Sequence, residues 1–142
     1  MKIIAYGSLM NKDSLKKTLE RDAILCKLVI PGYRRVFNAP FGSYAFLNLE
    51  KCDARSTEVL YFTIDRRELK LFQERERGSK LVEIRKGYYA FVWPEEKCAK
   101  LPVLQSYVDI CSEGASNMGI DFWKNTVKPS KIVDDRKSPR YN

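Results

Sequence analysis

The sequence predicts a single α+β domain whose small, curved, barrel-like sheet is mixed or antiparallel-rich and carries about three flanking helices. The chain has 142 residues, a length that suits one domain. Runs with the apolar or alternating pattern of strands outnumber the segments with helical spacing. Regular alternation of strands and helices is missing, as are a Walker loop and a Gly-x-Gly-x-x-Gly fingerprint, so a parallel nucleotide-binding sheet is not expected.

Short extended segments make up most of the predicted structure. The pattern of strands occurs at residues 4–6, 23–30, 33–38, 44–49, 59–64, 81–84 and 88–93. Between these segments, Pro31-Gly32 predicts a turn that closes one strand, and residues 52–56 predict a polar turn. Lys86-Gly87 predicts the connection of an antiparallel pair.

Three segments carry the signals of helices. Asn11 and Asp13 are candidate caps of a short first helix. Residues 65–68 resemble a capping box with Asp in the place of Ser or Thr, and Gly78 is a natural stop for the helix that begins there. The third helix is predicted over residues 103–118, where apolar residues recur at helical spacing.

The composition excludes several classes of chemistry. The chain has no histidine, which removes Ser-His-Asp and Cys-His catalysis, so any general base must be a carboxylate, Lys, Tyr or Cys. The four cysteines lie far apart, so we expect no zinc site and mostly buried, reduced thiols. No segment resembles a signal peptide or reaches membrane-spanning length, which predicts a cytoplasmic protein without a membrane partner.

The formal net charge is +8, but most basic residues are interleaved with acidic ones and are expected to form solvated surface. Only the end of the chain is a basic stretch, and it contains two prolines. We therefore expect residues 1–126 to form the domain and residues 127–142 to form a basic, partly irregular tail. Nucleic-acid binding is the least supported function, because no RNA- or DNA-binding motif is recognised. The oligomeric state stays open.

A turn between the first strand and the first helix is the clearest candidate for a binding site. At Gly7-Ser8 the chain leaves an apolar strand and runs into a helix start. Several backbone N–H groups then point in one direction, which suits a carboxylate, a phosphate or a developing oxyanion. Many such turns bind nothing, so this motif needs support from other segments.

Four separated stretches together resemble the γ-glutamylcyclotransferase-like family, which includes γ-glutamylamine cyclotransferases. They are Tyr6-Gly7-Ser8-Leu9, residues 31–38 (PGYRRVFN), residues 71–78 (LFQERERG) and residues 106–115 (SYVDICSEGA) followed by Gly119. The resemblance covers the chain up to about Trp123. It implies a small curved or barrel-like sheet with flanking helices. It also implies a small γ-glutamyl compound as the partner and a reaction that needs no metal or cofactor.

The resemblance assigns roles to particular residues. In the family the Tyr-Gly-Ser-Leu turn grips the substrate, and a glutamate in an Arg-Glu-x-Gly-like segment is the general acid/base. These roles fall on Tyr6, Gly7, Ser8 and Leu9 and on Glu76. The N–H groups of the turn would meet either the substrate carboxylate or the oxyanion. Tyr107 is a further candidate to bind substrate through its hydroxyl, although its helical spacing suits a core residue equally well.

The implied reaction is an intramolecular aminolysis. The free α-amine of a γ-glutamyl group attacks its own γ-carbonyl, a five-membered lactam closes, and 5-oxoproline and an amine are released. The α-ammonium, with a pKa near ~8, must lose a proton and the leaving nitrogen must gain one, a relay that one carboxylate can perform. For this role Glu76 should be partly buried, with its pKa raised above the free value of ~4.3.

Local sequence alone does not single out Glu76. A glutamate in a run of alternating Glu and Arg is usually solvated, and Glu74 fits a second register of the same motif. Arg75 and Arg77 would oppose a raised pKa if they touched the base, so we expect them to lie in solvent while Glu76 faces a pocket.

Departures from the family pattern keep a second function open. Phe72-Gln73 stands where Leu-Asp is common, Ser79 where an aromatic residue is expected, and Glu58 where a glycine often precedes a strand. The first two flank the proposed base and therefore bear on the identity of the substrate. The alternative function is a catalytically inactive module of the same fold that binds small anionic or γ-glutamyl-like ligands.

Overall fold

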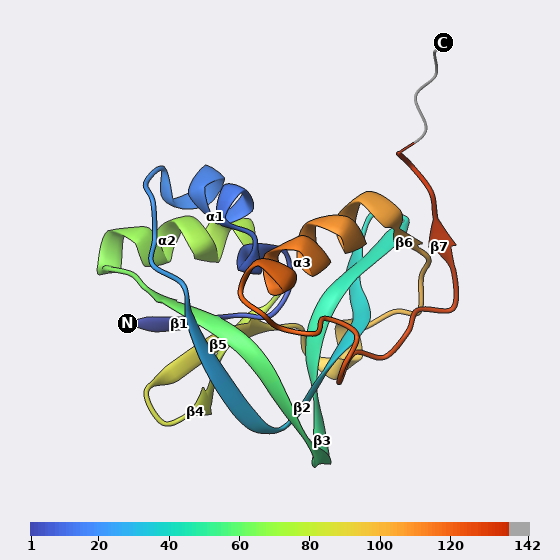
Figure 1. Cartoon of the computed structure of the whole chain (residues 1–142), viewed down its shortest axis with the longest axis horizontal. Helices are drawn as coiled ribbons and strands as arrows, with labels where there is room; N and C mark the ends of the chain where they lie inside the picture. The colour runs from blue at the N-terminus through green and yellow to red at the C-terminus, as the bar shows by residue number, and fades with distance from the viewer. Residues whose placement is uncertain (137–142) are drawn as a thin grey trace.

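Three helices cover one side of a five-stranded sheet in the computed structural model, which describes residues 1–136 (Figure 1). The sheet has the order β2-β3-β1-β5-β4, in which only β1 and β5 pair in parallel. Its strands are β1 (Lys2–Ala5), β2 (Cys26–Phe41), β3 (Tyr44–Thr63), β4 (Lys80–Arg85) and β5 (Tyr88–Val92). The predicted α+β class is confirmed, although the sheet is not closed into a barrel and leaves β2 and β4 as edges.

β2 and β3 form one long hairpin, so two of the predicted turns are wrong. Pro31-Gly32 and residues 52–56 both lie inside strands. The register shifts there, because Pro31 pairs with Ser56 whereas Tyr33 pairs with Lys51. An edge strand tolerates proline, and Gly32 adopts a φ of +79°, a conformation that favours glycine at a bulge. The hairpin consequently bends sharply instead of ending (Figure 1).

The first two helices begin at capping residues that the sequence predicts. The Asn11 side chain accepts a hydrogen bond from the Asp13 N–H at the start of α1 (Lys12–Leu19), so Asn11 is the cap and Asp13 is not. Asp65 and Glu68 form the predicted capping box of α2 (Arg66–Arg75). This helix ends at Arg75, before the predicted stop at Gly78.

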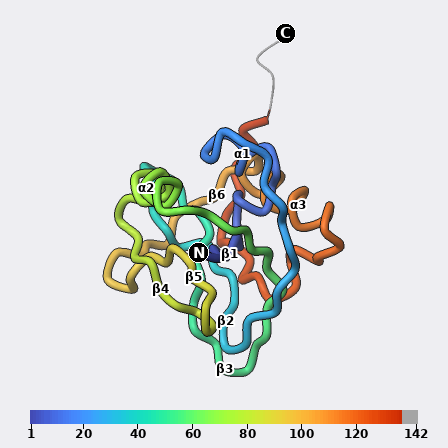
Figure 2. The backbone as a smooth tube through the Cα atoms, turned by 90° about the vertical axis from the view of Figure 1, so that its left-hand side faces the viewer, coloured from blue at the N-terminus to red at the C-terminus, as the bar shows by residue number. Residues whose placement is uncertain are grey.

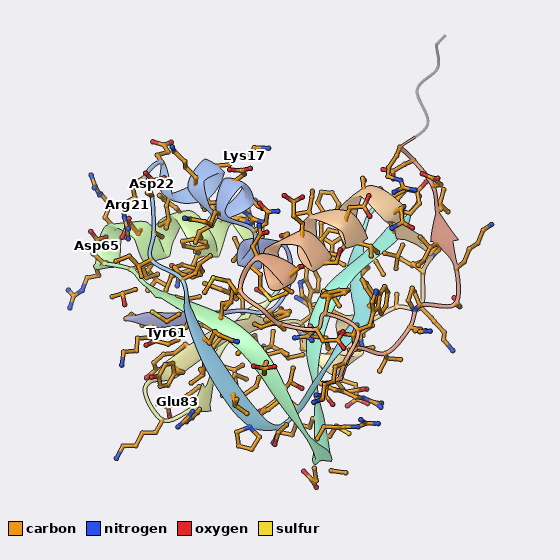
Figure 3. All side chains as sticks on the ribbon, viewed as in Figure 1. Lys17, Arg21, Asp22, Tyr61, Asp65 and Glu83 are labelled. Carbon is orange, nitrogen blue, oxygen red and sulfur yellow. The ribbon has the colours of Figure 1, made fainter. Side chains whose placement is uncertain are left out.

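The segment between α1 and β2 ties the two helices together. The Arg21 guanidinium donates hydrogen bonds to both carboxylate oxygens of Glu68 in the first turn of α2, at 2.6 and 3.1 Å, and to the Thr63 carbonyl at 3.0 Å. Figure 3 shows Arg21 beside Asp65 at this end of the helix. The end of α1 and the start of α2 are therefore held at the same place on the sheet.

The third helix starts later than predicted. Val103–Leu104 forms a short strand, β6, which pairs in parallel with β7 (Ile132–Val133), and α3 (Gln105–Asn117) follows it. Asp135 accepts hydrogen bonds from the Ser106 N–H, at 2.9 Å, and from its hydroxyl. The described part of the predicted tail thus lies against β6 and α3, while residues 137–142 fall outside the described residues.

The central strand β1 contributes to two apolar clusters, because successive side chains of a strand point to opposite faces. Ile3 packs into the larger cluster between the sheet and the helices, together with Leu15, Phe72 and Val108. Ile4 belongs to the smaller cluster, which includes Leu28, Ile30, Leu49, Val59 and Ala90. Figure 2 shows the helices above the strands, with α2 and α3 on either side of β1. β1 thus shares the larger cluster with side chains from all three helices.

The four cysteines are unpaired, but they are not mostly buried as predicted. Only Cys111, on α3, is buried, and burial raises the pKa of its thiol to about 12. The other three are partly exposed. Cys26 lies in the edge strand β2, Cys52 lies in β3 beside the bend of the hairpin, and Cys98 lies in the segment after β5. Within residues 1–136 we find no helix that is both long and apolar enough to span a membrane.

Candidate active site

Five segments that are far apart in the sequence surround one cavity of about 600 Å³, a volume in the range of roughly 300–1,000 Å³ for small-molecule sites. They are the turn after β1, the end of the β2–β3 hairpin, the end of α2, the end of β5 and the first turn of α3. The cavity is lined by all six predicted site residues: Tyr6, Gly7, Ser8, Leu9, Glu76 and Tyr107.

The turn after β1 is a single turn of 3-10 helix, η1 (Ser8–Met10). The Met10 N–H donates to the Gly7 carbonyl at 3.0 Å and is the first donor paired within the turn. The N–H groups of Ser8 and Leu9 precede it, so they have no partner inside the helix, and no described side chain caps this end. These donors lie beside the cavity.

Gly7 is required by a close approach to α3 and β3. A Cβ at this position would lie 3.1 Å from the Tyr107 hydroxyl oxygen and 3.4 Å from the Leu47 Cβ atom. The Tyr107 hydroxyl would have to move to admit a side chain, whereas the Leu47 contact would be an ordinary van der Waals one. The glycine therefore lets the turn pack directly against the wall of the cavity.

Glu76 is the C-cap residue that follows α2 directly. Its N–H donates to the Phe72 carbonyl at 2.8 Å, and its own carbonyl accepts hydrogen bonds from the Ser79 N–H at 3.0 Å and the Ser79 hydroxyl at 2.6 Å. The residue is half-buried, and burial raises the pKa of its carboxyl group while the neighbouring Arg75 opposes the shift. Glu74 also borders the cavity but is exposed, so the surroundings of the two candidate bases differ.

Arg75 is exposed, as expected, but its side chain makes hydrogen bonds to other elements. Its guanidinium donates hydrogen bonds to the Ser8 hydroxyl at 3.1 Å and to the Thr18 hydroxyl, which connects α2 with η1 and α1. Arg75 and Arg77 both line the cavity. A cation therefore lies close to the unpaired N–H groups of the turn.

Tyr6 and Tyr107 connect the lining of the cavity to the sheet through their hydroxyl groups. The Tyr6 hydroxyl donates to the Phe91 carbonyl of β5. Burial, and secondarily the charge of Glu76, raises the pKa of Tyr6. The Tyr107 hydroxyl accepts a hydrogen bond from the Leu47 N–H at 3.0 Å, and burial raises its pKa as well. Both phenols are therefore neutral at physiological pH, and each connects the site to the sheet.

The aromatic residues that line the opposite side were missed by sequence analysis. The Phe46 ring stacks on Tyr107 with ring centroids 4.3 Å apart and on Phe41 with centroids 5.0 Å apart. We call Phe41, Phe46 and Tyr107 the aromatic wall. Trp93 also lines the cavity and is held by the Asn48 side chain, which accepts from its N–H at 2.9 Å and donates to its carbonyl at 3.1 Å.

The residues at which the sequence departs from the family pattern do not line the cavity. Phe72 is fully buried in the main apolar cluster, Gln73 is exposed, and Ser79 supports the backbone of Glu76. Glu58 lies near Lys27, with 3.8 Å between carboxylate and ammonium. Among the described residues we also find no group of three or more His, Cys, Asp or Glu placed to hold a metal ion.

Comparison with solved structures gives matches over nearly the whole chain. A γ-glutamyl cyclotransferase superposes with a TM-score of 0.72 at 12% identity, covering 95% of this chain and 94% of that one. An uncharacterized protein from Homo sapiens gives 0.72 at 13% identity, covering 94% and 91%. YkqA from Bacillus subtilis gives 0.69 at 18% identity, covering 82% of this chain and 48% of its own.

Sequence comparisons add nothing to this likeness, since neither a protein-family model nor a curated protein matches the chain. At identities of 12–18% the solved structures establish the arrangement of the backbone. The three helices and the mixed sheet belong to that arrangement. The chain therefore has the γ-glutamyl cyclotransferase fold, as the resemblance of its motifs predicts.

Proposed function

We propose that this protein is a γ-glutamyl cyclotransferase, which converts a γ-glutamyl amino acid, amine or isopeptide into 5-oxoproline and a free amine. One observation carries the proposal: a half-buried glutamate, whose pKa burial raises, and a turn with unpaired backbone N–H groups line the same cavity. The likeness of the fold to a solved γ-glutamyl cyclotransferase supports it. So does the absence of histidine, because it leaves a carboxylate as a natural choice for the base.

Positioning supplies much of the proposed rate acceleration. A γ-glutamyl chain that is curled in the cavity holds its α-amine against its own γ-carbonyl, and well-oriented intramolecular attack has effective molarities of about 10⁵ M or more. The N–H groups of Ser8 and Leu9, with the guanidinium of Arg75 nearby, favour a negatively charged oxygen of the substrate at the turn. The cavity thus offers one polar side at which the glutamyl group is oriented.

Glu76 is proposed to move the protons. Its raised pKa makes the carboxylate a stronger base than an exposed glutamate, and therefore better matched to an α-ammonium with a pKa near ~8. The carboxylate accepts a proton from the α-amine as the new C–N bond forms, and the resulting carboxylic acid delivers a proton to the leaving nitrogen as the old C–N bond breaks. Proton transfer of this kind typically contributes about 10²–10⁴-fold to the rate.

The proposal is tested with a panel of γ-glutamyl compounds and the purified full-length protein. We expect mass spectrometry to detect 5-oxoproline and the released amine in equal amounts from at least one member of the panel. Thermal stabilisation by γ-glutamyl compounds without any product would support the inactive binding module instead. Neither product nor stabilisation with any member would contradict both functions.

A further inference from the structure

We infer that the leaving group accepted by this site is an amine that carries an aromatic or bulky apolar substituent and no carboxylate. The inference rests on the proposed cyclotransferase function and extends it to the other half of the cavity. The polar and charged side chains that line the cavity come from the first turn and the end of α2, together with the tyrosine hydroxyls. The residues contributed by the β2–β3 hairpin are all apolar: Ala39, Pro40, Phe41, Phe46 and Leu47.

The aromatic wall runs from the proposed reaction centre to the surface. Its inner end is Tyr107, whose hydroxyl lies 3.1 Å from the position a Cβ of Gly7 would occupy. Phe46 stacks on Tyr107 with an interplanar angle of 4°, and Phe41 stacks on Phe46 at 20°. Phe41 is 67% exposed at the outer end. A γ-glutamyl group bound at the turn can therefore direct its leaving group along a continuous row of rings.

The exposure of Phe41 favours a ligand over a purely structural role. A phenylalanine that is two-thirds exposed contributes little to the core, whereas a second ring stacked on this row would be partly removed from water. Trp93 and Phe91 line the same cavity and add further apolar surface. The site is accordingly suited to a leaving group with a ring or a branched chain.

The charges around the cavity argue against a carboxylate on the leaving group. Among the described lining residues the two cations are Arg75 and Arg77, both at the end of α2. Arg75 is held at the turn by hydrogen bonds to the Ser8 and Thr18 hydroxyls, and Glu74 and Glu76 lie in the same segment as both cations. The aromatic wall itself offers a carboxylate no charged partner, so an anionic leaving group would be desolvated there without compensation.

Three substrates with the same two-carbon stem test the inference: γ-glutamyl-phenethylamine, γ-glutamyl-ethylamine and γ-glutamyl-β-alanine. We expect kcat/KM to be at least about 10-fold higher for the phenethylamine than for the ethylamine, in line with the discrimination of hydrophobic pockets. The β-alanine compound should be the poorest substrate. Equal values for the first two, or a preference for the carboxylate, would overturn the inference.

A pair of variants ties the preference to the aromatic wall. Phe41→Ala should reduce the ratio of kcat/KM for phenethylamine over ethylamine several-fold, and an unchanged ratio would contradict the assignment. Ile24→Ala is the matched control, because Ile24 is 83% exposed and does not line the cavity, so this variant should keep the ratio of the unaltered protein. Product from all three substrates without preference overturns only this inference, and so does no product from these three when another member of the γ-glutamyl panel is turned over. Only the absence of product across the whole panel contradicts the proposed reaction as well.

Discussion

Glu76 is more buried than its charged neighbours because α2 ends just before it. Residues 74–77 alternate Glu and Arg, and nothing in their order shows which side chain is desolvated. α2 ends at Arg75, and the hydrogen bonds from Ser79 to the Glu76 carbonyl fix the backbone beyond the helix. Glu76 thereby lines the cavity as a half-buried residue while Glu74 stays exposed. The resemblance to the family favoured Glu76 over Glu74 because of its motif. The end of the helix explains why Glu76 is half-buried and Glu74 is not.

The raised pKa of Glu76 predicts that Glu76→Gln stabilises the protein at alkaline pH. Ionisation is less favourable in the folded than in the unfolded chain, so the stabilising effect of the protonated group is fully present below the unfolded pKa. That effect is lost as the pH rises through the folded pKa. We expect Glu76→Gln to have a higher Tm than the unaltered protein at pH 8, with the difference vanishing near pH 4.

Differential scanning calorimetry at the two pH values measures this effect. Glu74→Gln provides the control, because its exposed side chain should change the stability by less than about 0.5 kcal/mol at either pH. A Glu76→Gln variant that is less stable than the unaltered protein at pH 8 would show that the carboxylate is not desolvated.

Gly7→Ala is predicted to damage the site through the Tyr107 hydroxyl. The new Cβ would lie 3.1 Å from that oxygen, so either the turn or α3 must shift. We expect a lower Tm for Gly7→Ala, and a smaller loss when the same change is made in a Tyr107→Phe background, where the crowding oxygen is gone. Strictly additive losses in this double-mutant cycle would rule out the contact as the cause.

At the scale of elements, local signals predicted the helices better than the long hairpin. The capping box at Asp65 and Glu68 acts within one turn of chain, so it is readable from the sequence. The continuity of β2 and β3 through Pro31-Gly32 depends instead on pairing between residues that are far apart, such as Ile30 and Thr57. Turn-forming residues at a bulge look the same as residues at a true turn, which is why two turns were predicted wrongly.

The start of α1 gives a prediction that separates its two candidate caps. Asn11 accepts from the Asp13 N–H and donates to the Ile110 carbonyl of α3 at 3.2 Å, whereas the Asp13 side chain does not cap the helix. Asn11→Ala should lower the free energy of unfolding by about 1–2 kcal/mol. Asp13→Ala should lower it by only a few tenths of a kcal/mol, about the size of a screened interaction with the helix dipole. Urea denaturation compares the two, and the reverse order would contradict the capping assignment.

At the scale of the whole molecule, Arg35 connects the sheet to the segment after α3. Its fully buried guanidinium donates to the carbonyls of Glu58 at 2.8 Å and of Phe122 and Lys124 at 2.9 Å, and to the Thr126 hydroxyl at 2.8 Å. Burial lowers the pKa of Arg35 to about 10, which still leaves it charged at neutral pH. This arginine belongs to the second stretch that carries the family resemblance, and its contacts are those of a structural residue.

Arg35→Ala is therefore predicted to be severely destabilising. It would leave the buried Phe122 carbonyl and the partly buried Glu58 and Lys124 carbonyls without their donor, and an unsatisfied buried group costs about 1–3 kcal/mol, so we expect a loss of at least about 3 kcal/mol in urea denaturation. Arg34→Ala is the control, because the ion pair of Arg34 with Glu50 is more than one-third exposed on both sides and should contribute less than about 1 kcal/mol. Similar losses for the two variants would refute the anchoring role.

Only one side of the candidate site could be predicted from the sequence. The turn at residues 6–9 and Glu76 lie in short motifs by which the chain resembles the family, and that resemblance singled them out. Phe41 and Phe46 belong to the end of a hairpin and stack on each other, and the stacking of Phe46 on Tyr107 joins residues about sixty positions apart. Such a contact depends on how α3 packs on β3, so no local sequence pattern predicts it.

The sharpest test compares 5-oxoproline release by the unaltered protein, Glu76→Gln and Glu74→Gln under identical conditions. Both substitutions remove one carboxylate from the same segment, but only one carboxylate is desolvated beside the turn. We expect Glu76→Gln to lose about 10²–10⁴-fold in kcat and Glu74→Gln to stay within about 3-fold of the unaltered protein. Full activity in Glu76→Gln, or an equal loss in both variants, would contradict the role of Glu76 as the general acid/base.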